Sequence, residues 1–175
     1  MLIVGENLRG LIIQELICDQ QCYDNTCISL SLGSEVIWLN PNENYNILDY
    51  GDNIPQECVK KSHINDSGLV IPPHKSLIAS SFENITMPLG YFGLLQTKGS
   101  LARMMVSLHF SDGQIDPGFT GKVTFEIMNN SDFSIRIRKR QVVGNLYIFK
   151  TSTNDMVSYH GRYQNADGPT IFRAE

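Results

Sequence analysis

The sequence predicts a mainly β fold, a sandwich or barrel of short strands preceded by one short helix. From Gly68 onward, short stretches that alternate apolar and polar residues are separated by turn residues, at the intervals typical of such folds. Apolar residues recur at helical spacing only near the N-terminus. With 42% hydrophobic and 18% charged residues among 175, the chain can bury the core that this fold requires.

The helix is expected over residues 6–17, where apolar residues recur every three to four positions. Those residues are Leu8, Leu11, Ile12 and Leu16. Residues 27–32 then alternate apolar and small polar side chains, and residues 36–39 are apolar throughout, so each stretch is expected to form a strand. Residues 40–68 carry most of the Asn, Asp and Pro turn signals, which predicts a loop-rich excursion.

Alternation is clearest in the second half of the chain. Residues 122–128 place Val123, Phe125 and Ile127 on one face of a strand. The other face of that strand carries Thr124, Glu126 and Met128. Residues 134–138 alternate in the same way, and their basic residues are best explained as the solvated face of a strand.

One domain is expected over residues 1–150, followed by a tail of different character over residues 151–175. The tail begins with polar residues and continues through Tyr159–Gln164, which mixes aromatic, basic and glycine residues. A packed strand gains nothing from that mixture. It is typical of a segment that folds over a ligand.

Charge and apolar runs exclude several classes of protein. The formal charge of -4, from 14 basic and 18 acidic residues, argues against binding nucleic acid through bulk charge. No apolar run approaches the roughly 20 residues that span a bilayer. The first residues form no basic targeting segment. We therefore expect a cytoplasmic protein with no nucleic-acid or membrane partner.

The cysteines are expected to be reduced thiols that bind no zinc. Structural zinc sites usually have paired C-x-x-C elements. The spacing of the four cysteines, Cys18, Cys22, Cys27 and Cys58, provides none. A chain of this length has no need of disulfides to fold.

A first polar cluster, Lys98–Arg103, places two cations, a glycine and a hydroxyl within six residues. Backbone N–H groups and charged side chains in such a cluster can hold phosphate oxygens. The alternative is a turn into a short helix with solvated ends, which the residues taken alone favour.

A second cluster, Gly113–Gly121, leads into the strand that carries Glu126. Asp116, before Pro117-Gly118, is suited to a turn. Glu126 lies among apolar neighbours, so it either faces solvent or is partly desolvated. Desolvation would raise the pKa of its carboxyl toward that of a useful general base. The sequence leaves both alternatives open.

These clusters, together with Tyr159–Thr170, resemble the dCTP deaminase family of the trimeric dUTPase-like superfamily. The resemblance runs through Lys98–Arg103, Ile115–Gly121, Phe125-Glu126 and the tail, in that order. It implies a homotrimer of distorted jelly-roll or β-barrel subunits, with deoxycytidine nucleotide sites shared between subunits. It also implies Mg²⁺ bound through the substrate triphosphate, and no zinc.

The resemblance implies a role for each matching residue. Glu126 would be the general base on water, with Arg103 beside it, and Asp116 would hold the sugar 3′-hydroxyl. The phosphate contacts would come from Lys98, Gly99 and Ser100. The closing tail would contribute Tyr159, Arg162 and Tyr163.

The sequence departs from the family pattern at several of these positions. Lys98 and Gly99 replace an Arg and a Ser, and Ala166 replaces a Gln of the tail. Asp112 stands where the family usually has a small residue, so its charge is expected to raise the pKa of one of the two carboxyls or to repel the triphosphate.

The resemblance favours an enzyme that converts dCTP to dUTP and ammonia. Three alternatives stay open: a dUTPase on the same scaffold, a bifunctional enzyme that converts dCTP to dUMP, and a catalytically silent nucleotide-binding trimer. The bifunctional enzyme would use Asp112 for a second attack of water, at phosphorus.

Overall fold

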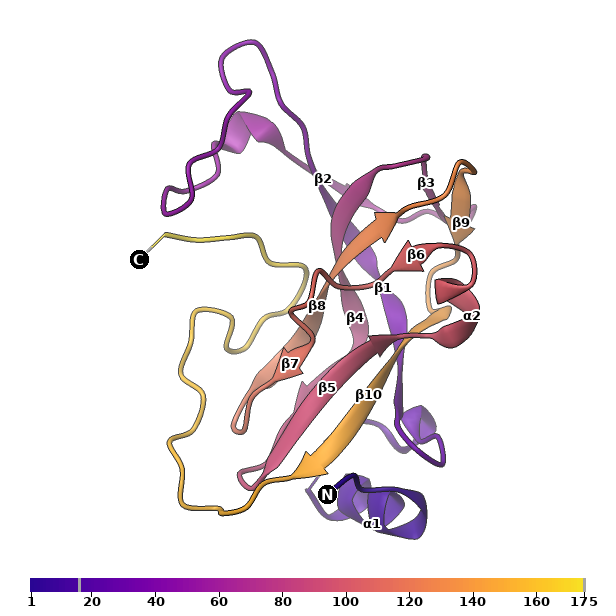
Figure 1. The fold of residues 1–175 in the computed structure, drawn as a ribbon, viewed down its shortest axis with the longest axis vertical. Coiled ribbons are helices and arrows are strands. Elements are labelled where there is room, and N and C mark those ends of the chain that lie inside the picture. The colour runs from indigo at the N-terminus through magenta and orange to yellow at the C-terminus, as the bar shows by residue number, and fades with distance from the viewer. Residues whose placement is uncertain (16, 175) are drawn as a thin grey trace.

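A computed structural model describes residues 1–15 and 17–174 of the chain, which form a curled antiparallel sheet with few helices (Figure 1). The helices are α1 (Gly5–Glu15), η1 (Gln20–Cys22), η2 (Gln56–Cys58) and α2 (Gly99–Ala102). The strands are β1 (Ile28–Leu39), β2 (Val59–His63), β3 (Leu69–Ile71), β4 (Ser76–Thr86), β5 (Tyr91–Thr97), β6 (Val106–Ser107), β7 (Gln114–Ile115), β8 (Thr120–Asn129), β9 (Ile135–Ile137) and β10 (Val142–Lys150). The predicted mainly β fold with a short N-terminal helix is confirmed.

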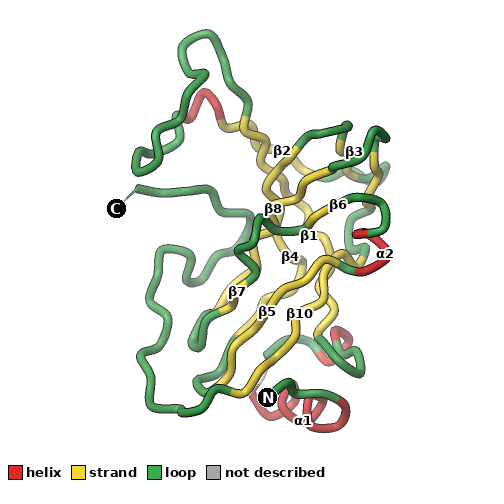
Figure 2. Tube along the Cα trace, in the orientation of Figure 1, coloured by secondary structure: helices red, strands yellow, loops and turns green. Residues whose placement is uncertain are grey.

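The main sheet has the strand order β6-β8-β4-β1-β10-β5-β7, with β2 paired to β1 outside that path. Its pairings are antiparallel, and β3 and β9 form a separate two-stranded sheet. The sheet curls into a half-barrel, and α1 lies at one end of it (Figure 1). Long loops, including the segment before β2 and the C-terminal tail, extend from one side of the sheet (Figure 2).

The core follows the predicted alternation. In β8, Val123, Phe125 and Ile127 are buried, whereas the residues between them are half-buried. The helix α1 buries Leu8, Leu11 and Ile12 against the same core. Leu16, the fourth residue of the predicted helical face, lies outside the described residues. None of the helices in the described part of the chain is long and apolar enough to cross a membrane.

The prediction of separate strands over 27–32 and 36–39 is wrong, because β1 is continuous through Gly33. A Cβ at Gly33 would lie 2.9 Å from the carbonyl oxygen of Ser80. Glycine therefore lets β4 approach closely, and the β1–β4 register shifts between Leu32 and Val36. The glycine marks a close approach of two strands within the sheet rather than a turn.

The prediction of a loop over residues 40–68 is wrong at its end, because β2 pairs with β1 there. Residues Val59–His63 lie opposite Glu35–Leu39 in antiparallel register. Their side chains are half-buried or exposed. A strand with little apolar burial has little apolar alternation, so its sequence carries no strand signal.

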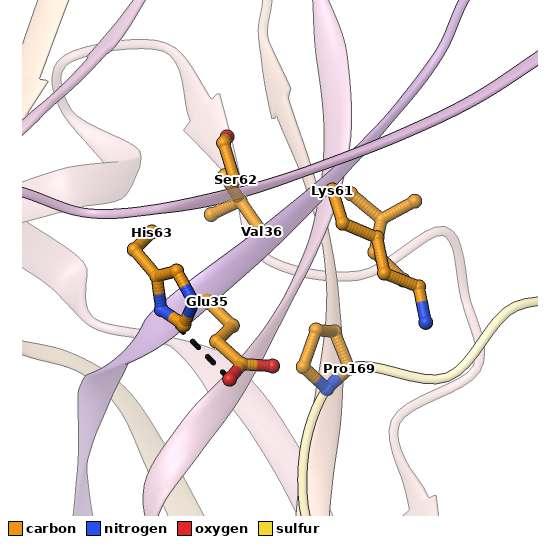
Figure 3. Close-up of a pocket in the computed structure, with 7 residues that line it drawn as sticks. Glu35, Val36, Lys61, Ser62, His63 and Pro169 are labelled. Carbon is orange, nitrogen blue, oxygen red and sulfur yellow. Dashed lines mark ion pairs between the residues drawn. The ribbon is translucent and has the colours of Figure 1, made fainter.

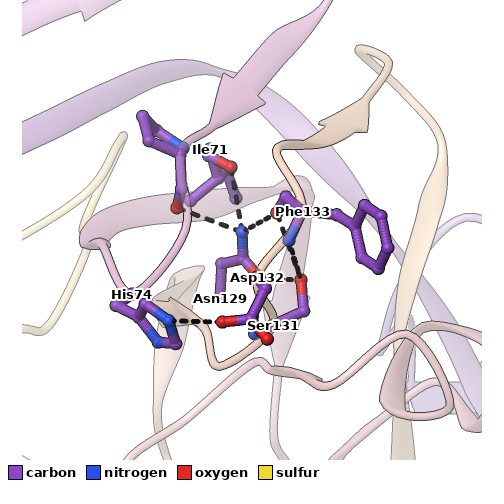
Figure 4. Close-up of polar contacts among 7 residues, drawn as sticks. Ile71, His74, Asn129, Ser131, Asp132 and Phe133 are labelled. Atoms are coloured by element: carbon purple, nitrogen blue, oxygen red, sulfur yellow. Dashed lines mark hydrogen bonds and ion pairs between the residues drawn. The ribbon is translucent and has the colours of Figure 1, made fainter.

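Asn129, at the end of β8, connects two segments of backbone, Ile71-Pro72 and the loop at Phe133 (Figure 4). Its buried amide nitrogen donates hydrogen bonds to the carbonyl oxygens of Ile71, Pro72 and Phe133, at 3.0, 3.0 and 2.7 Å. Its amide oxygen accepts hydrogen bonds from the backbone and the hydroxyl of Ser131. Asn129 thus fixes the loop between β8 and β9 against the end of β3.

Replacing Asn129 by Ala is expected to lower the free energy of unfolding by about 2–4 kcal/mol, because carbonyl groups at the loop lose their donors in a part-buried site. Urea unfolding followed by circular dichroism measures this change. Ser131→Ala is the matched control and is expected to cost about 1 kcal/mol or less, because its partner Asn129 stays in place. Equal effects of the two substitutions would contradict this account of Asn129.

Candidate active site

A tight turn between β7 and β8 presents Asp116. The backbone N–H of Phe119 donates to the Asp116 carbonyl at 3.1 Å. Gly118 has a φ of +88°, and Pro117 occupies the position before it. This is the sequence and geometry of a type II turn, in which the third residue needs a positive φ. The side chain of Asp116 is exposed and faces a cavity that β8 also lines.

That cavity has a volume of about 430 Å³ and lies between β7, β8 and the C-terminal tail. Leu95, Ile115 and Val123 contribute to its apolar wall. Its titratable lining residues are Asp112, Asp116, Lys122, Glu126, Tyr159 and Tyr163. The fold therefore brings together four of the residues to which the resemblance assigns a role, from β8, from the turn before it and from the tail.

Glu126 is the desolvated carboxylate of this cavity. Burial, and second the negative charge of Asp112, raise the pKa of the Glu126 carboxyl to about 7, against the opposing effect of backbone hydrogen bonds at Phe110 and at Glu126 itself. Its Oε2 atom is buried and has no hydrogen-bond partner among the described residues. Of the two alternatives that the sequence left open for Glu126, the structure therefore shows partial desolvation. The expectation that Asp112 raises the pKa of a neighbouring carboxyl is met here.

The tail crosses the first half of β8 and forms one rim of the cavity. Backbone hydrogen bonds join Asn165 to Thr120 and Lys122 to Ala166, each at 2.7 Å. Gly121 and Ala166 form an isolated parallel bridge. Lys122 and Asp167 form an ion pair of 2.9 Å. The side chain of Gln164 hydrogen-bonds to the backbone at Gly118 and Thr120. The hydroxyls of Thr124 and Thr170 form a hydrogen bond of 2.8 Å.

The aromatic residues of the tail face the cavity, whereas Arg162 does not line it. Tyr159 packs edge-on against Phe119, with ring centroids 5.9 Å apart, and Tyr163 lines the same wall. The guanidinium of Arg162 donates to the carbonyl of Arg173 and lies 6.0 Å from the ring centroid of Phe172. The tail ends beside the excursion before β2, where the backbone N–H of Ala174 donates to Asn53 at 2.9 Å (Figure 1).

The cluster at α2 does not reach this cavity. Gly99, Ser100 and Arg103 are exposed and Lys98 is half-buried, and none of them lines the cavity of Glu126. The guanidinium of Arg103 donates to the carbonyl of Gly99 at 3.0 Å. Arg103 also lines a separate hollow of about 560 Å³ that exposes Met104, Met105 and Phe133. Within one chain, the two clusters predicted to act together are therefore apart.

A second cavity beside the tail, of about 220 Å³, lies where β1 and β2 meet Pro169 (Figure 3). His63 and Glu35 face each other across the strands at 3.8 Å, with 79% and 51% of their side chains exposed. An ion pair so open to water contributes little to stability or binding. The cavity of Glu126, which combines buried and charged groups, is the stronger candidate for chemistry.

Sequence reasoning missed the residues that attach the tail to β8. The alternation indicates Thr124 only as part of one face of a strand, the resemblance includes Thr170 only as part of the tail, and neither assigns a role to Lys122. Their partners lie more than 40 positions away, and periodicity contains no information on such distant contacts. The one indication in the sequence is Gln164, a residue of the tail motif, whose side chain contacts the backbone at Gly118 and Thr120.

The thiols of Cys18 and Cys22 lie together, but the cysteines and histidines form no metal-binding cluster in the part of the chain that the structure describes. Cys22, Cys27 and Cys58 are buried free thiols and Cys18 is a half-buried one. In residues 1–15 and 17–174, no three His, Cys, Asp or Glu side chains lie close enough together to hold a metal ion. The Nδ1 atom of His109 is buried without a hydrogen-bond partner in the same part of the chain.

The sequence and the fold agree with those of known proteins. The family described as dCTP deaminase-like matches residues 6–151. A relative named dCTP deaminase, dUMP-forming, from Acidothermus cellulolyticus is 35% identical over 114 residues, which cover 62% of this chain and 60% of the relative. A relative of the same name from Beutenbergia cavernae is 31% identical over 138 residues, which cover 76% of this chain and 72% of the relative.

A solved structure, the 2′-deoxycytidine 5′-triphosphate deaminase of Agrobacterium tumefaciens, has a similar fold. Its TM-score is 0.65 at 15% sequence identity, over 84% of this chain and 47% of that one. The match to the Acidothermus relative likewise spans 60% of that protein's length. The family match extends from α1 to the first residue of the tail and includes both α2 and Glu126. The chain therefore belongs to the dCTP deaminase-like family.

Proposed function

We propose that this chain catalyses the hydrolytic deamination of dCTP, with Glu126 as the general base on water. The observation that carries the proposal is the carboxyl of Glu126, which is half-buried in a cavity and has a pKa raised to about 7. A base with a pKa near the working pH transfers protons most effectively. Membership of the family and the names of the relatives support cytosine nucleotides as substrates.

The reaction needs two proton relays at one carboxylate. Glu126 takes a proton from water as the water oxygen bonds to C4 of cytosine and passes it to N3, which gives a tetrahedral intermediate with a hydroxyl and an amino group on C4. Glu126 then takes the proton of that hydroxyl and gives it to the amino group as the C4–N bond breaks, so that ammonia leaves and the C4 carbonyl forms. Glu126 is thereby returned to its ionised form, ready for the next water. This balance requires no zinc ligand from the protein.

The rest of the cavity suits a deoxynucleoside. We expect Asp116 to accept a hydrogen bond from the sugar 3′-hydroxyl, because its carboxylate lies exposed at the cavity wall. Tyr159 and Tyr163 provide aromatic surface on the tail side. The tail, residues 151–175, is proposed to act as a lid that closes over the bound nucleotide.

A triphosphate needs more positive charge than the described residues of one chain bring to the cavity. Lys122 is the cation that the described residues bring to the cavity, and it is paired with Asp167. We propose that a neighbouring copy contributes Lys98, Gly99, Ser100 and Arg103 in a homotrimer, and that the substrate arrives as its Mg²⁺ complex. Arg103 would then stand beside Glu126 of its neighbour. A cytoplasmic location stays a prediction.

The names of the relatives favour dUMP as the final product over the dUTP predicted from the sequence. We propose a second hydrolysis in the same site, in which water attacks phosphorus and pyrophosphate leaves. Asp112 adds a second carboxylate to the cavity and could activate that water.

The deciding experiment incubates the purified chain separately with dCTP and dUTP in the presence of Mg²⁺. We expect dCTP to yield dUMP, ammonia and pyrophosphate in equal amounts. Accumulation of dUTP would confine the activity to deamination. Hydrolysis of dUTP with no ammonia from dCTP would indicate a dUTPase. Binding of dCTP without any product would identify a catalytically silent nucleotide-binding protein and overturn the proposal.

A further inference from the structure

We propose that Asp112 is a positioning residue for the proton of Glu126, so that the two carboxylates act as a pair that holds a single proton in the resting site. This inference rests on the proposed function, because its kinetic consequence concerns the base of the deamination. It assigns a task in the first half of the reaction to a residue that stands where the family usually has a small side chain.

The two side chains reach one cavity from different elements. Asp112 lies in the loop between β6 and β7, and Glu126 lies in the middle of β8, opposite Ile78 of β4. Asp112 is exposed, whereas Glu126 is half-buried and its Oε2 atom is inaccessible and unpartnered among the described residues. Burial disfavours the ionised form of Glu126, so the proton of this cavity resides on Glu126.

The charges around Glu126 favour keeping that proton. The other titratable groups that line the cavity are Asp112 and Asp116 before β8, Lys122 on β8, and Tyr159 and Tyr163 on the tail. The residues of β4 and β5 at its wall, Ile78 and Leu95, are apolar. Lys122 is paired with Asp167 at 2.9 Å, so it compensates the carboxylates of the cavity only weakly. Like charges that share one site disfavour each other's ionisation, so the charge of Asp112 favours the protonated form of Glu126.

Of the two aspartates, Asp112 has the larger effect on the pKa of Glu126. Its negative charge is the second cause, after burial, that raises the pKa of Glu126 to about 7, whereas Asp116 is not among the causes. Once Glu126 has lost its proton, the nearby negative charge of Asp112 makes it a stronger base toward water. When Glu126 has taken the proton of water, the same charge stabilises the protonated form until the proton passes to the substrate.

The test is the pH dependence of dCTP deamination by Asp112→Asn, which removes the charge and keeps the shape. The acidic limb of kcat/KM should lie near pH 7 in the wild type, because Glu126 must be ionised in the free enzyme. In D112N the limb should move to lower pH. At pH 6 the rate relative to its own plateau should rise about two- to threefold. Asp112→Glu restores a charge and should return the limb toward neutrality.

Asp116→Asn is the matched control, because it removes a charge from the same cavity. It should raise KM and leave the acidic limb in place. Equal shifts in D112N and D116N, or no shift in D112N, would overturn the pairing of Asp112 with Glu126.

A titration without substrate separates this inference from the proposed function. Carbon-13 NMR of glutamate carboxyls in the full chain, with Glu126→Gln to assign the signal, should show Glu126 titrating near neutrality and at lower pH in D112N. This result would support the pair even if dCTP were not deaminated, in which case only the proposed function would fail. An unchanged titration in D112N would overturn the pair even in an active enzyme.

Discussion

Glu126→Gln is expected to lower the rate of dCTP deamination by about 10²- to 10⁴-fold, the range that general-base catalysis contributes. Gln is nearly the same size as Glu and cannot accept a proton from water. Release of ammonia from dCTP under saturating Mg²⁺ measures the loss. Binding of dCTP should change little, because the phosphate and sugar contacts do not depend on this carboxylate.

The stability of this variant provides the control. Because the pKa of Glu126 is raised in the folded protein, the native state binds its proton more tightly than the unfolded chain does. The free energy of unfolding of the wild type should therefore fall as the pH rises from about 4.5 to about 7, the interval between the ordinary and the raised pKa. E126Q should lack this contribution and be at least as stable above pH 7. An inactive variant that is also less stable at pH 8 would point to a structural role instead.

Arg103→Ala is expected to abolish deamination when this variant is assayed alone. Activity should return when it is co-assembled with E126Q. Neither variant has a complete site by itself. If each site takes Glu126 from one copy and Arg103 from its neighbour, one in four sites of an equal, randomly assembled mixture carries both groups. Co-refolding the two inactive variants should thus restore about a quarter of the wild-type rate.

Recovery also requires that α2 of one copy approach the cavity of another, which the separation of the two clusters within one chain makes necessary. Subunits that are mixed without refolding, so that copies do not exchange, are the negative control. A refolded mixture that stays inactive, although both variants fold and bind nucleotide, would place Arg103 and Glu126 in the same chain's site.

The sequence predicted local structure well where buried and exposed side chains alternate regularly along an element. In β8, the alternation of Val123, Phe125 and Ile127 with polar residues identified the strand and the face that carries Glu126. The Asp116-Pro117-Gly118 turn was equally readable, because type II turns demand those residue types. The residues that define a strand face or a tight turn lie within a few positions of one another in the chain. Their order and spacing are therefore enough to predict the local geometry.

What the sequence did not predict depends on contacts between distant segments. The glycine at position 33 is needed because Ser80 approaches it closely, and Ser80 lies in a strand almost 50 positions away. Without knowledge of that contact, the glycine is interpreted as the end of a strand. The strand β2 has little buried apolar surface and thus no alternation. Whether Glu126 was solvated could not be decided either, since the cavity that it lines is also lined by a tail that begins after β10.

The hydrogen bonds between the tail and β8 have a consequence for protein handling. The strand β6 pairs only with Met128 and Asn129 of β8 in the described structure, and the tail occupies backbone groups at Thr120 and Lys122 at the other end. Without the tail, β8 would present an unpaired edge rich in β-branched and aromatic residues, which is a template for intermolecular strand addition. A truncated chain would therefore be prone to aggregate, so that lost activity after truncation would not by itself reveal a lost lid. Point substitutions at Tyr159 or Tyr163 leave this edge covered and separate the two effects.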